Sequence, residues 1–81
     1  MNWQQILERL GEIVKDILRE DVVVEETSHL DRDLPMDSLV MLELGLAVED
    51  AFRIEIRGRD LNGLKTVADL INTIQERGGK R

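Results

Sequence analysis

The sequence predicts an all-α protein, a small four-helix bundle of three longer helices and one short helix. Three segments repeat apolar residues every three or four positions, and no segment of any length alternates apolar and polar residues as a strand does. The chain has 81 residues, of which 42% are hydrophobic, so it has room for one small domain with a thin core. We therefore predict a single domain over residues 1–81, with residues 78–81 forming a frayed tail.

The first predicted helix covers about residues 3–19. Its apolar residues fall in a sector about 140° wide, and charged residues fill the opposite side of the helix. These apolar residues are Trp3, Ile6, Leu7, Leu10, Ile13, Val14, Ile17 and Leu18. The pattern predicts that this helix buries one face against the rest of the bundle.

A long, mostly polar connection over residues 21–35 follows the first helix. We interpret His29 as an ordinary loop residue rather than a catalytic one, and Pro35 prevents a helix from continuing through Leu34. A connection of this length needs apolar anchors in a compact domain. The residues expected to pin it to the core are Val22, Val24, Leu30 and Leu34.

The second helix is predicted to begin at Asp37 or Ser38 and to end near Phe52. Asp37 is a favourable N-cap, and Met36 and Met41 occupy the two positions of a hydrophobic staple. These signals indicate a well-defined start for this helix.

Two further helices complete the bundle. A short one is expected around Arg59 to Leu61, bounded by Gly58 and Gly63. The last one begins at Thr66, which forms a capping box with Asp69, and continues until Gly78-Gly79.

The second helix has more apolar residues than one buried face needs. Its core face comprises Val40, Met41, Leu44, Ala47, Val48, Ala51 and Phe52. The opposite sector, which should be solvated, holds Ser38, Leu39, Leu42, Glu43, Gly45, Leu46, Glu49 and Asp50. Exposed leucines beside carboxylates are typical of a docking surface for a basic partner. The alternative is a helix buried nearly all round, which the acidic residues disfavour because charged groups resist burial.

The charge distribution supports a protein partner. The formal net charge is −6, but residues 21–52 carry nine acids and one base, a net of −8, whereas residues 53–81 carry four acids and seven bases, a net of +3. The acidic middle repels phosphate backbones, so we expect no nucleic-acid partner, and it attracts basic protein surfaces. Solubility alone is the alternative reason for these acids.

The composition excludes several classes of function. Without cysteine and with one histidine, the chain lacks disulfides, thiolate zinc sites and two-histidine metal sites. The acids Asp31, Asp33 and Asp37 echo a calcium loop, but the required glycine and glutamate are out of register, so we predict no metal. The sequence has no membrane-spanning run and no signal peptide, so we expect a cytoplasmic protein. It also has no glycine-rich phosphate loop, and so small a bundle has little space from which to exclude water, so we expect that it is not an enzyme.

The second helix carries an ordered set of residues that resembles the acyl carrier protein family. Asp-Leu-Pro-Met-Asp-Ser-Leu ends at Leu39, a glutamate follows the serine by five positions, and an acidic pair precedes Phe52 and Ile-Glu-Ile. Thr66 and Val67 then open the last helix. The resemblance implies the family's helical bundle, with Ser38 receiving 4′-phosphopantetheine from coenzyme A beside Asp37 and Leu39.

The resemblance also implies partners and a cargo site. The implied partners are a phosphopantetheinyl transferase and acyl-loading, condensing and tailoring enzymes with basic docking patches, which a monomeric carrier visits in turn. Together with the helix pattern, it assigns partner contacts to Leu39, Leu42, Glu43, Leu46, Glu49 and Asp50. In many family members the acyl chain folds back between the helices. The residues positioned to line that space are Leu44, Phe52, Ile56, Leu61, Leu64 and Ile71.

The chain departs from the family pattern at two places. Pro35 stands where the family often has glycine, so we expect a stiffer turn before Ser38. Arg57-Gly58-Arg59-Asp60 replaces a stretch that is proline-led and acidic in fatty-acid carriers. This reversal of charge favours a discrete carrier of polyketide or other secondary-metabolite assembly over the housekeeping carrier of fatty-acid synthesis. The alternatives are an aminoacyl or peptidyl carrier and an unmodified helical adaptor that binds one basic protein partner.

Overall fold

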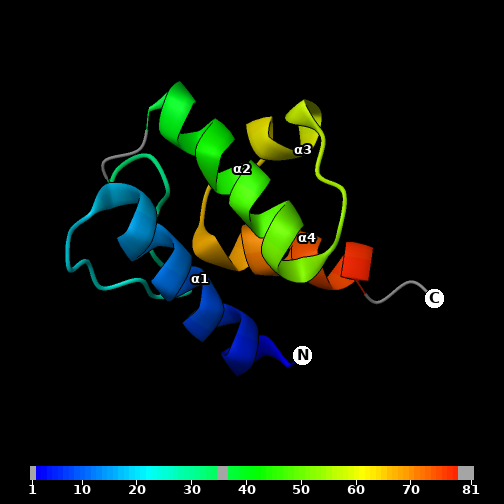
Figure 1. Cartoon of the computed structure of the whole chain (residues 1–81), viewed down its shortest axis with the longest axis horizontal. Helices are drawn as coiled ribbons and strands as arrows, with labels where there is room; N and C mark the ends of the chain where they lie inside the picture. The colour runs from blue at the N-terminus through cyan, green and yellow to red at the C-terminus, as the bar shows by residue number, and fades with distance from the viewer. Residues whose placement is uncertain (1, 35–36, 79–81) are drawn as a thin grey trace.

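The computed structural model describes residues 2–34 and 37–78, and over these ranges it contains helices and no strand. The elements in chain order are α1 (Trp3–Leu18), α2 (Ser38–Phe52), α3 (Gly58–Asn62) and α4 (Val67–Gly78). Helix α1 packs against both α2 and α4. In Figure 1 the short α3 is drawn on the opposite side of α2 from α1. The predicted bundle of three longer helices and one short helix is confirmed.

Helix α1 is closed at both ends by its own residues. The Asn2 side chain accepts a hydrogen bond from the Gln5 backbone N–H at 2.9 Å, and the Gln5 side chain accepts one from the Asn2 N–H at 3.0 Å. At the other end Arg19 adopts the left-handed conformation with φ 57°, and its N–H donates to the Lys15 carbonyl at 2.8 Å. The helix therefore ends one residue before the predicted limit.

The core contains the faces that the apolar patterns predict. On α1 the side chains of Ile6, Leu10, Ile13 and Val14 are buried, and the other four apolar residues pack at the edge of the core. Leu30 and Leu34 of the long connection are also buried, with Val22 and Val24 beside them, so the predicted anchors are confirmed. Among residues 2–34 and 37–78, the buried hydrophobic residues are Ile6, Leu10, Ile13, Val14, Leu30, Leu34, Leu44, Val48, Ile56, Val67, Leu70, Ile71 and Ile74.

The long connection is also hydrogen-bonded to the start of α4. The Val67 N–H donates to the Ser28 carbonyl at 3.0 Å, and the Leu30 N–H donates to the Lys65 carbonyl at 2.9 Å. His29 and Thr66 form an isolated antiparallel bridge between these contacts. These bonds fix the long connection to the residues that open α4, although the connection has no regular structure.

The limits of α3 and α4 follow their capping residues. Asp69 N–H donates to the Thr66 hydroxyl at 3.2 Å and Thr66 N–H donates to the Asp69 carboxylate at 3.1 Å, which confirms the predicted capping box. Helix α3 begins at Gly58, one residue before the predicted start, because Asp60 accepts from the Arg57 N–H and caps the turn there. The predicted staple at Met36 and the tail beyond Gly78 lie outside the described residues.

Candidate functional site

Ser38 is the first residue of α2, and its side chain is exposed. The preceding residue, Asp37, is the N-cap: its carboxylate accepts a hydrogen bond from the Val40 N–H at 2.9 Å, as predicted. Ser38 therefore lies at the end of α2 that carries the free first-turn N–H groups and the positive end of the helix dipole. This environment fits a phosphodiester on Ser38, because its negative charge is favoured at a helix N-terminus and the hydroxyl is accessible to a transferring enzyme.

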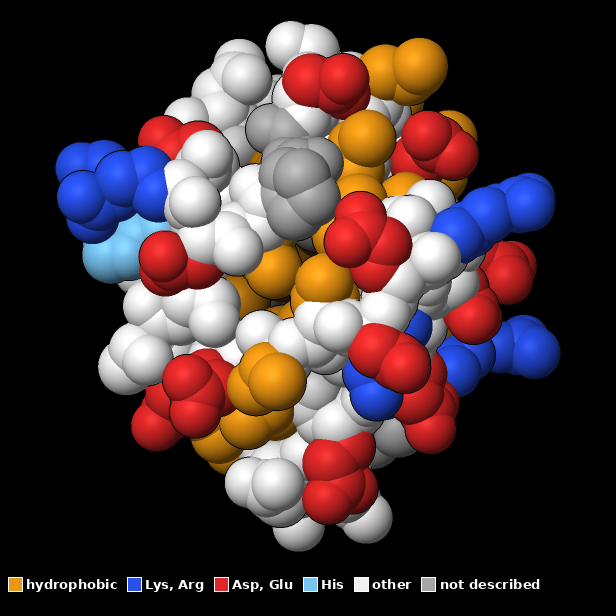
Figure 2. Space-filling view, turned by 90° about the vertical axis from the view of Figure 1, so that its left-hand side faces the viewer, with side chains coloured by type: hydrophobic (Ala, Val, Ile, Leu, Met, Phe, Trp, Pro, Cys, Tyr) orange, Lys and Arg blue, Asp and Glu red, His pale blue; other side chains and the backbone are white. Residues whose placement is uncertain are grey.

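Helix α2 leaves three large apolar side chains in solvent. Leu39, Leu42 and Leu46 are 66%, 53% and 58% exposed, while Leu44 and Val48 of the same helix are fully buried. Near the top of Figure 2, where α2 begins, exposed hydrophobic side chains lie beside acidic ones. The alternative of a helix buried all round is therefore wrong. The residues predicted to contact partners are Leu39, Leu42, Glu43, Leu46, Glu49 and Asp50, and we call this predicted set the docking surface.

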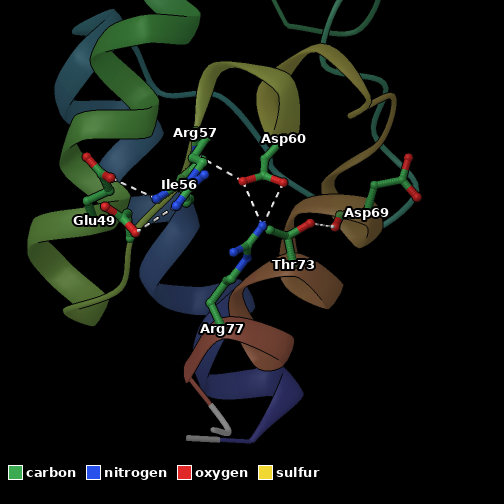
Figure 3. Close-up of polar contacts among 8 residues, drawn as sticks. Glu49, Ile56, Arg57, Asp60, Asp69, Thr73 and Arg77 are labelled. Carbon is green, nitrogen blue, oxygen red and sulfur yellow. Dashed lines mark hydrogen bonds and ion pairs between the residues drawn. The ribbon is translucent and has the colours of Figure 1, made fainter.

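Glu49 has a structural contact in addition to its place on the docking surface. One carboxylate oxygen, Oε2, accepts a hydrogen bond from the Ile56 backbone N–H at 2.7 Å (Figure 3). The bond crosses from α2 to the segment that leads into α3, so Glu49 fixes where this segment runs. Glu43 and Asp50, by contrast, are exposed.

Gly45 was expected in the solvated sector of α2, and this expectation is wrong. Its backbone is buried, and a Cβ atom at this position would lie 3.0 Å from Cδ1 of Leu61. The angular pattern of α2 could not identify this contact, because it depends on where α3 packs. A lone glycine inside an apolar helix was the available signal, since such a residue often marks a close approach.

The six residues that the resemblance placed along a cargo site all belong to one apolar cluster. Leu44 and Ile71 are fully buried, and Ile56 is 9% exposed. Phe52, Leu61 and Leu64 are half-buried and pack against the same core. The structure thus places all six side chains in the core of the bundle or against it.

Asp60 makes the polar contacts that connect α3 to α4, and sequence reasoning missed them. One nitrogen of Arg77, Nη2, donates to both carboxylate oxygens of Asp60 at 2.8 and 2.9 Å, while Asp60 also accepts from the Arg57 N–H at 3.0 Å (Figure 3). The Arg57 N–H bond and the positive charge of Arg77 lower the pKa of Asp60 below its ordinary value of 3.8. Residues seventeen positions apart carry no periodic signal, so the sequence offered no route to this pair.

The arrangement around His29 does not resemble a catalytic site. His29 Nε2 lies 2.9 Å from an Arg32 nitrogen, and Nδ1 lies 3.5 Å from the Asp33 carboxylate, all on the exposed connection. The His29 backbone N–H donates to Asp33 at 2.7 Å and holds the pKa of that carboxyl below 3.8. Ser28 Oγ instead accepts from the Glu25 N–H at 3.1 Å. In these contacts the side chains of Asp33 and Ser28 accept hydrogen bonds from backbone N–H groups of the same connection, as in ordinary turns.

Residues 2–34 and 37–78 contain no group of three or more His, Cys, Asp or Glu side chains placed to hold a metal ion. The helices of these residues are also too short or too polar to cross a membrane.

Comparison with known proteins identifies the family. The family model described as a phosphopantetheine attachment site matches residues 8–74. An acyl carrier protein of Thermobifida fusca is 43% identical over 75 residues, covering 90% of this chain and 94% of the relative. A meromycolate extension acyl carrier protein of Mycolicibacterium aurum is 37% identical, covering 90% and 76% of the two chains.

A solved structure supports the same fold. The crystal structure of an acyl carrier protein from Thermotoga maritima superimposes with a TM-score of 0.84 and 23% identity, covering 95% of this chain and 91% of that chain. Carriers of this family hold a covalently attached 4′-phosphopantetheine group and do not catalyse reactions themselves. From its phosphopantetheine-attachment match and its close relatives, the chain belongs to the acyl carrier protein family.

Proposed function

We propose that Ser38 is the attachment point of the 4′-phosphopantetheine arm and that the chain is a discrete carrier of acyl groups. The arm's terminal thiol holds the acyl group as a thioester, so the protein itself needs no cysteine. The observation that carries the proposal is an exposed serine at the first position of α2, capped by Asp37 and followed by the docking surface. We infer that the single domain acts as a monomer in the cytoplasm.

The chemistry at Ser38 needs an external transferase and coenzyme A. Its Oγ forms the new bond to the phosphorus next to pantetheine, and the bond between the two linked phosphates of coenzyme A breaks. The nucleotide leaves as adenosine 3′,5′-bisphosphate, and the transferase takes the proton of the serine hydroxyl. The first-turn N–H groups of α2 then face the negatively charged phosphodiester. Asp37 maintains this geometry by holding the Val40 N–H, while the docking surface receives the transferase.

Intact-mass measurement tests this proposal. The unmodified chain is incubated with coenzyme A and a broad-specificity phosphopantetheinyl transferase, and its mass should rise by one 4′-phosphopantetheinyl group. Ser38→Ala should abolish the gain. Thr27→Ala, which removes another exposed hydroxyl, should leave the gain unchanged.

Peptide mapping of the product locates the modified residue. A single modified fragment containing Ser38 supports the assignment. A wild-type chain that gains no mass while a known carrier is modified in the same reaction contradicts it. In that outcome the unmodified adaptor remains as the function, with the same docking surface bound to one basic partner.

The docking surface defines the partners that we propose. Acidic residues beside exposed leucines favour enzymes with basic patches around an apolar depression, including the transferase and the acyl-loading, condensing and tailoring enzymes. A carrier that visits several enzymes needs small, rapidly exchanging interfaces, which steering by opposite charge provides. Charge reversal with Glu43→Lys should slow loading by the transferase and reduce its salt dependence.

We propose a dedicated polyketide or other secondary-metabolite pathway for this carrier. Arg57 and Arg59 are both exposed at the start of α3, which supports a partner set different from that of the housekeeping fatty-acid carrier. Relatives of this chain include carriers of meromycolate extension, so a specialised fatty-acid pathway is the second candidate. Competition assays with malonyl, long-chain acyl and aminoacyl donors would separate these pathways and the aminoacyl or peptidyl carrier.

A further inference from the structure

Helix α3 is the least embedded helix of the bundle. It has five residues and none is buried, whereas α1, α2 and α4 each bury three or four. An element with so little buried apolar surface opens at a smaller free-energy cost than the whole bundle unfolds. The position of α3 therefore depends on a few individual contacts.

Two contacts fix the beginning and the inner side of α3. The Glu49 carboxylate holds the Ile56 N–H at 2.7 Å, two residues before α3 begins. The half-buried side chain of Leu61 lies against the bare backbone of Gly45 on α2. The first contact can act as a pivot, whereas the second separates when α3 moves outward.

The third contact is the ion pair between α3 and the last turn of α4. Arg77 Nη2 donates to both oxygens of Asp60, whose side chain is only 18% exposed, compared with 39% for Arg77. Partial shielding makes this pair stronger than a fully solvated surface pair. Arg77 also stands where the negative end of the α4 dipole favours a cation.

We propose that Asp60 and Arg77 form a latch that holds α3 against α4. When the pair breaks, α3 swings outward about the Glu49–Ile56 hydrogen bond while α1, α2 and α4 stay packed. Leu61 then leaves Gly45 and exposes part of the apolar core against which it packs. If the chain is an acyl carrier modified on Ser38, as proposed above, the latch controls how readily an apolar cargo inserts beneath α3.

Hydrogen exchange on the unmodified chain tests the latch. In Arg77→Gln, the amides of residues 58–64 should exchange on the order of tenfold faster than in the wild type, because a charge-assisted hydrogen bond is lost. The buried amides of α1 should keep their exchange rates. Arg77→Lys should restore part of the protection, and Glu76→Gln, an exposed neighbour on α4, should change nothing.

Asp60→Asn separates the ion pair with Arg77 from the hydrogen bond by which Asp60 caps α3. Asparagine retains an oxygen that can accept from the Arg57 N–H but loses the charge that attracts Arg77. The double variant Asp60→Asn with Arg77→Gln should exchange no faster in α3 than either single variant, because both remove one interaction. Additive effects, unchanged α3 exchange, or an equal acceleration in α1 would each overturn the latch.

Loaded protein tests the control over cargo. Octanoyl and acetyl groups are placed on the arm of the wild type and of Arg77→Gln, and the amide chemical shifts of Leu44 and Leu61 are compared. The octanoyl-minus-acetyl difference should be larger in Arg77→Gln, because a state that already opens readily is easier to occupy. If the Asp60–Arg77 pair only stabilised the fold, Arg77→Gln would bind the octanoyl group more weakly than the wild type. An octanoyl-minus-acetyl shift difference that is equal to or smaller than the wild-type value therefore contradicts the control over cargo.

The two proposals fail in different ways. A chain that accepts no arm contradicts the assignment of Ser38 but leaves the latch to be decided by exchange of the unmodified protein. A chain that accepts the arm and shows unchanged α3 exchange in Arg77→Gln contradicts the latch alone.

Discussion

Helices α1 and α2 are similar in length, but they distribute their apolar side chains differently. In α1 every apolar residue is buried or packs at the edge of the core. In α2, Leu44 and Val48 are fully buried, yet three further leucines are more than half exposed. Packing within the bundle thus accounts for every apolar side chain of α1, whereas three leucines of α2 remain outside the core. Such surface is costly in water and is typical of a binding site.

The largest expected effect tests whether the buried faces of the two helices are equivalent. Leu10→Ala in α1 and Leu44→Ala in α2 should each reduce the free energy of unfolding by about 2–5 kcal/mol, since both remove a fully buried side chain. Chemical denaturation monitored by circular dichroism measures this loss. A much smaller loss for Leu44→Ala would mean that α2 contributes little to the core, and the comparison would fail.

The second effect concerns the start of each helix. Asp37→Ala removes the acceptor of the Val40 N–H, and Asn2→Ala removes the acceptor of the Gln5 N–H. Each change should lower the free energy of unfolding by about 1 kcal/mol. Only Asp37→Ala should also slow modification of Ser38, because only this cap shapes the first turn of α2. Equal loading rates in the two variants would count against a role for the cap at the attachment site.

The order of elements and the buried faces could be predicted from periodicity and capping residues. Asp37, Thr66 and Asp69 were identified because a cap acts within three positions along the chain. The contacts of α3 could not be predicted in this way. Leu61 meets Gly45, and Asp60 meets Arg77, through tertiary packing that joins distant positions, so no helical period relates them. Local signals thus defined the long helices but not how the short one is attached.

The candidate site shows the same division. Ser38 and the exposed leucines of α2 lie on one helix, so an angular argument was enough to group them. Glu49 was assigned to partners, but its bond to the Ile56 N–H also gives it a part in the fold. A one-dimensional pattern cannot separate these two roles, since both require an acid at the edge of the buried face.

Acidification separates acids that stabilise the fold from acids that only face solvent. Backbone N–H groups of Thr66 and Lys65 lower the pKa of Asp69 below its ordinary value of 3.8. A lowered pKa contributes stability that is present above the unfolded value and is lost as pH falls through the folded value. The unfolding free energies of the wild type and Asp69→Asn should therefore differ at pH 7 and converge below about pH 4.

Glu43→Gln is the control for this measurement, since Glu43 is exposed on the docking surface. Its unfolding free energy should lie within about 0.5 kcal/mol of the wild-type value at pH 7, because the side chain is exposed. A difference for Asp69→Asn that stayed constant down to pH 2 would show that the capping carboxylate acts through shape rather than charge.

The smallest expected effect on stability is the most informative about α2. Leu46→Ala removes an exposed side chain and should change the free energy of unfolding by less than about 0.5 kcal/mol. It should nevertheless lower kcat/KM for loading by the transferase about fivefold to tenfold, because the apolar surface of the transferase loses the leucine that it contacts. Val23→Ala is the matched control, since Val23 is 79% exposed but lies on the long connection rather than on α2. If both variants load like the wild type, the exposed leucines do not contact the transferase. If both load equally slowly, the loss reflects exposed apolar area in general, and the distinction between α1 and α2 would not extend to function.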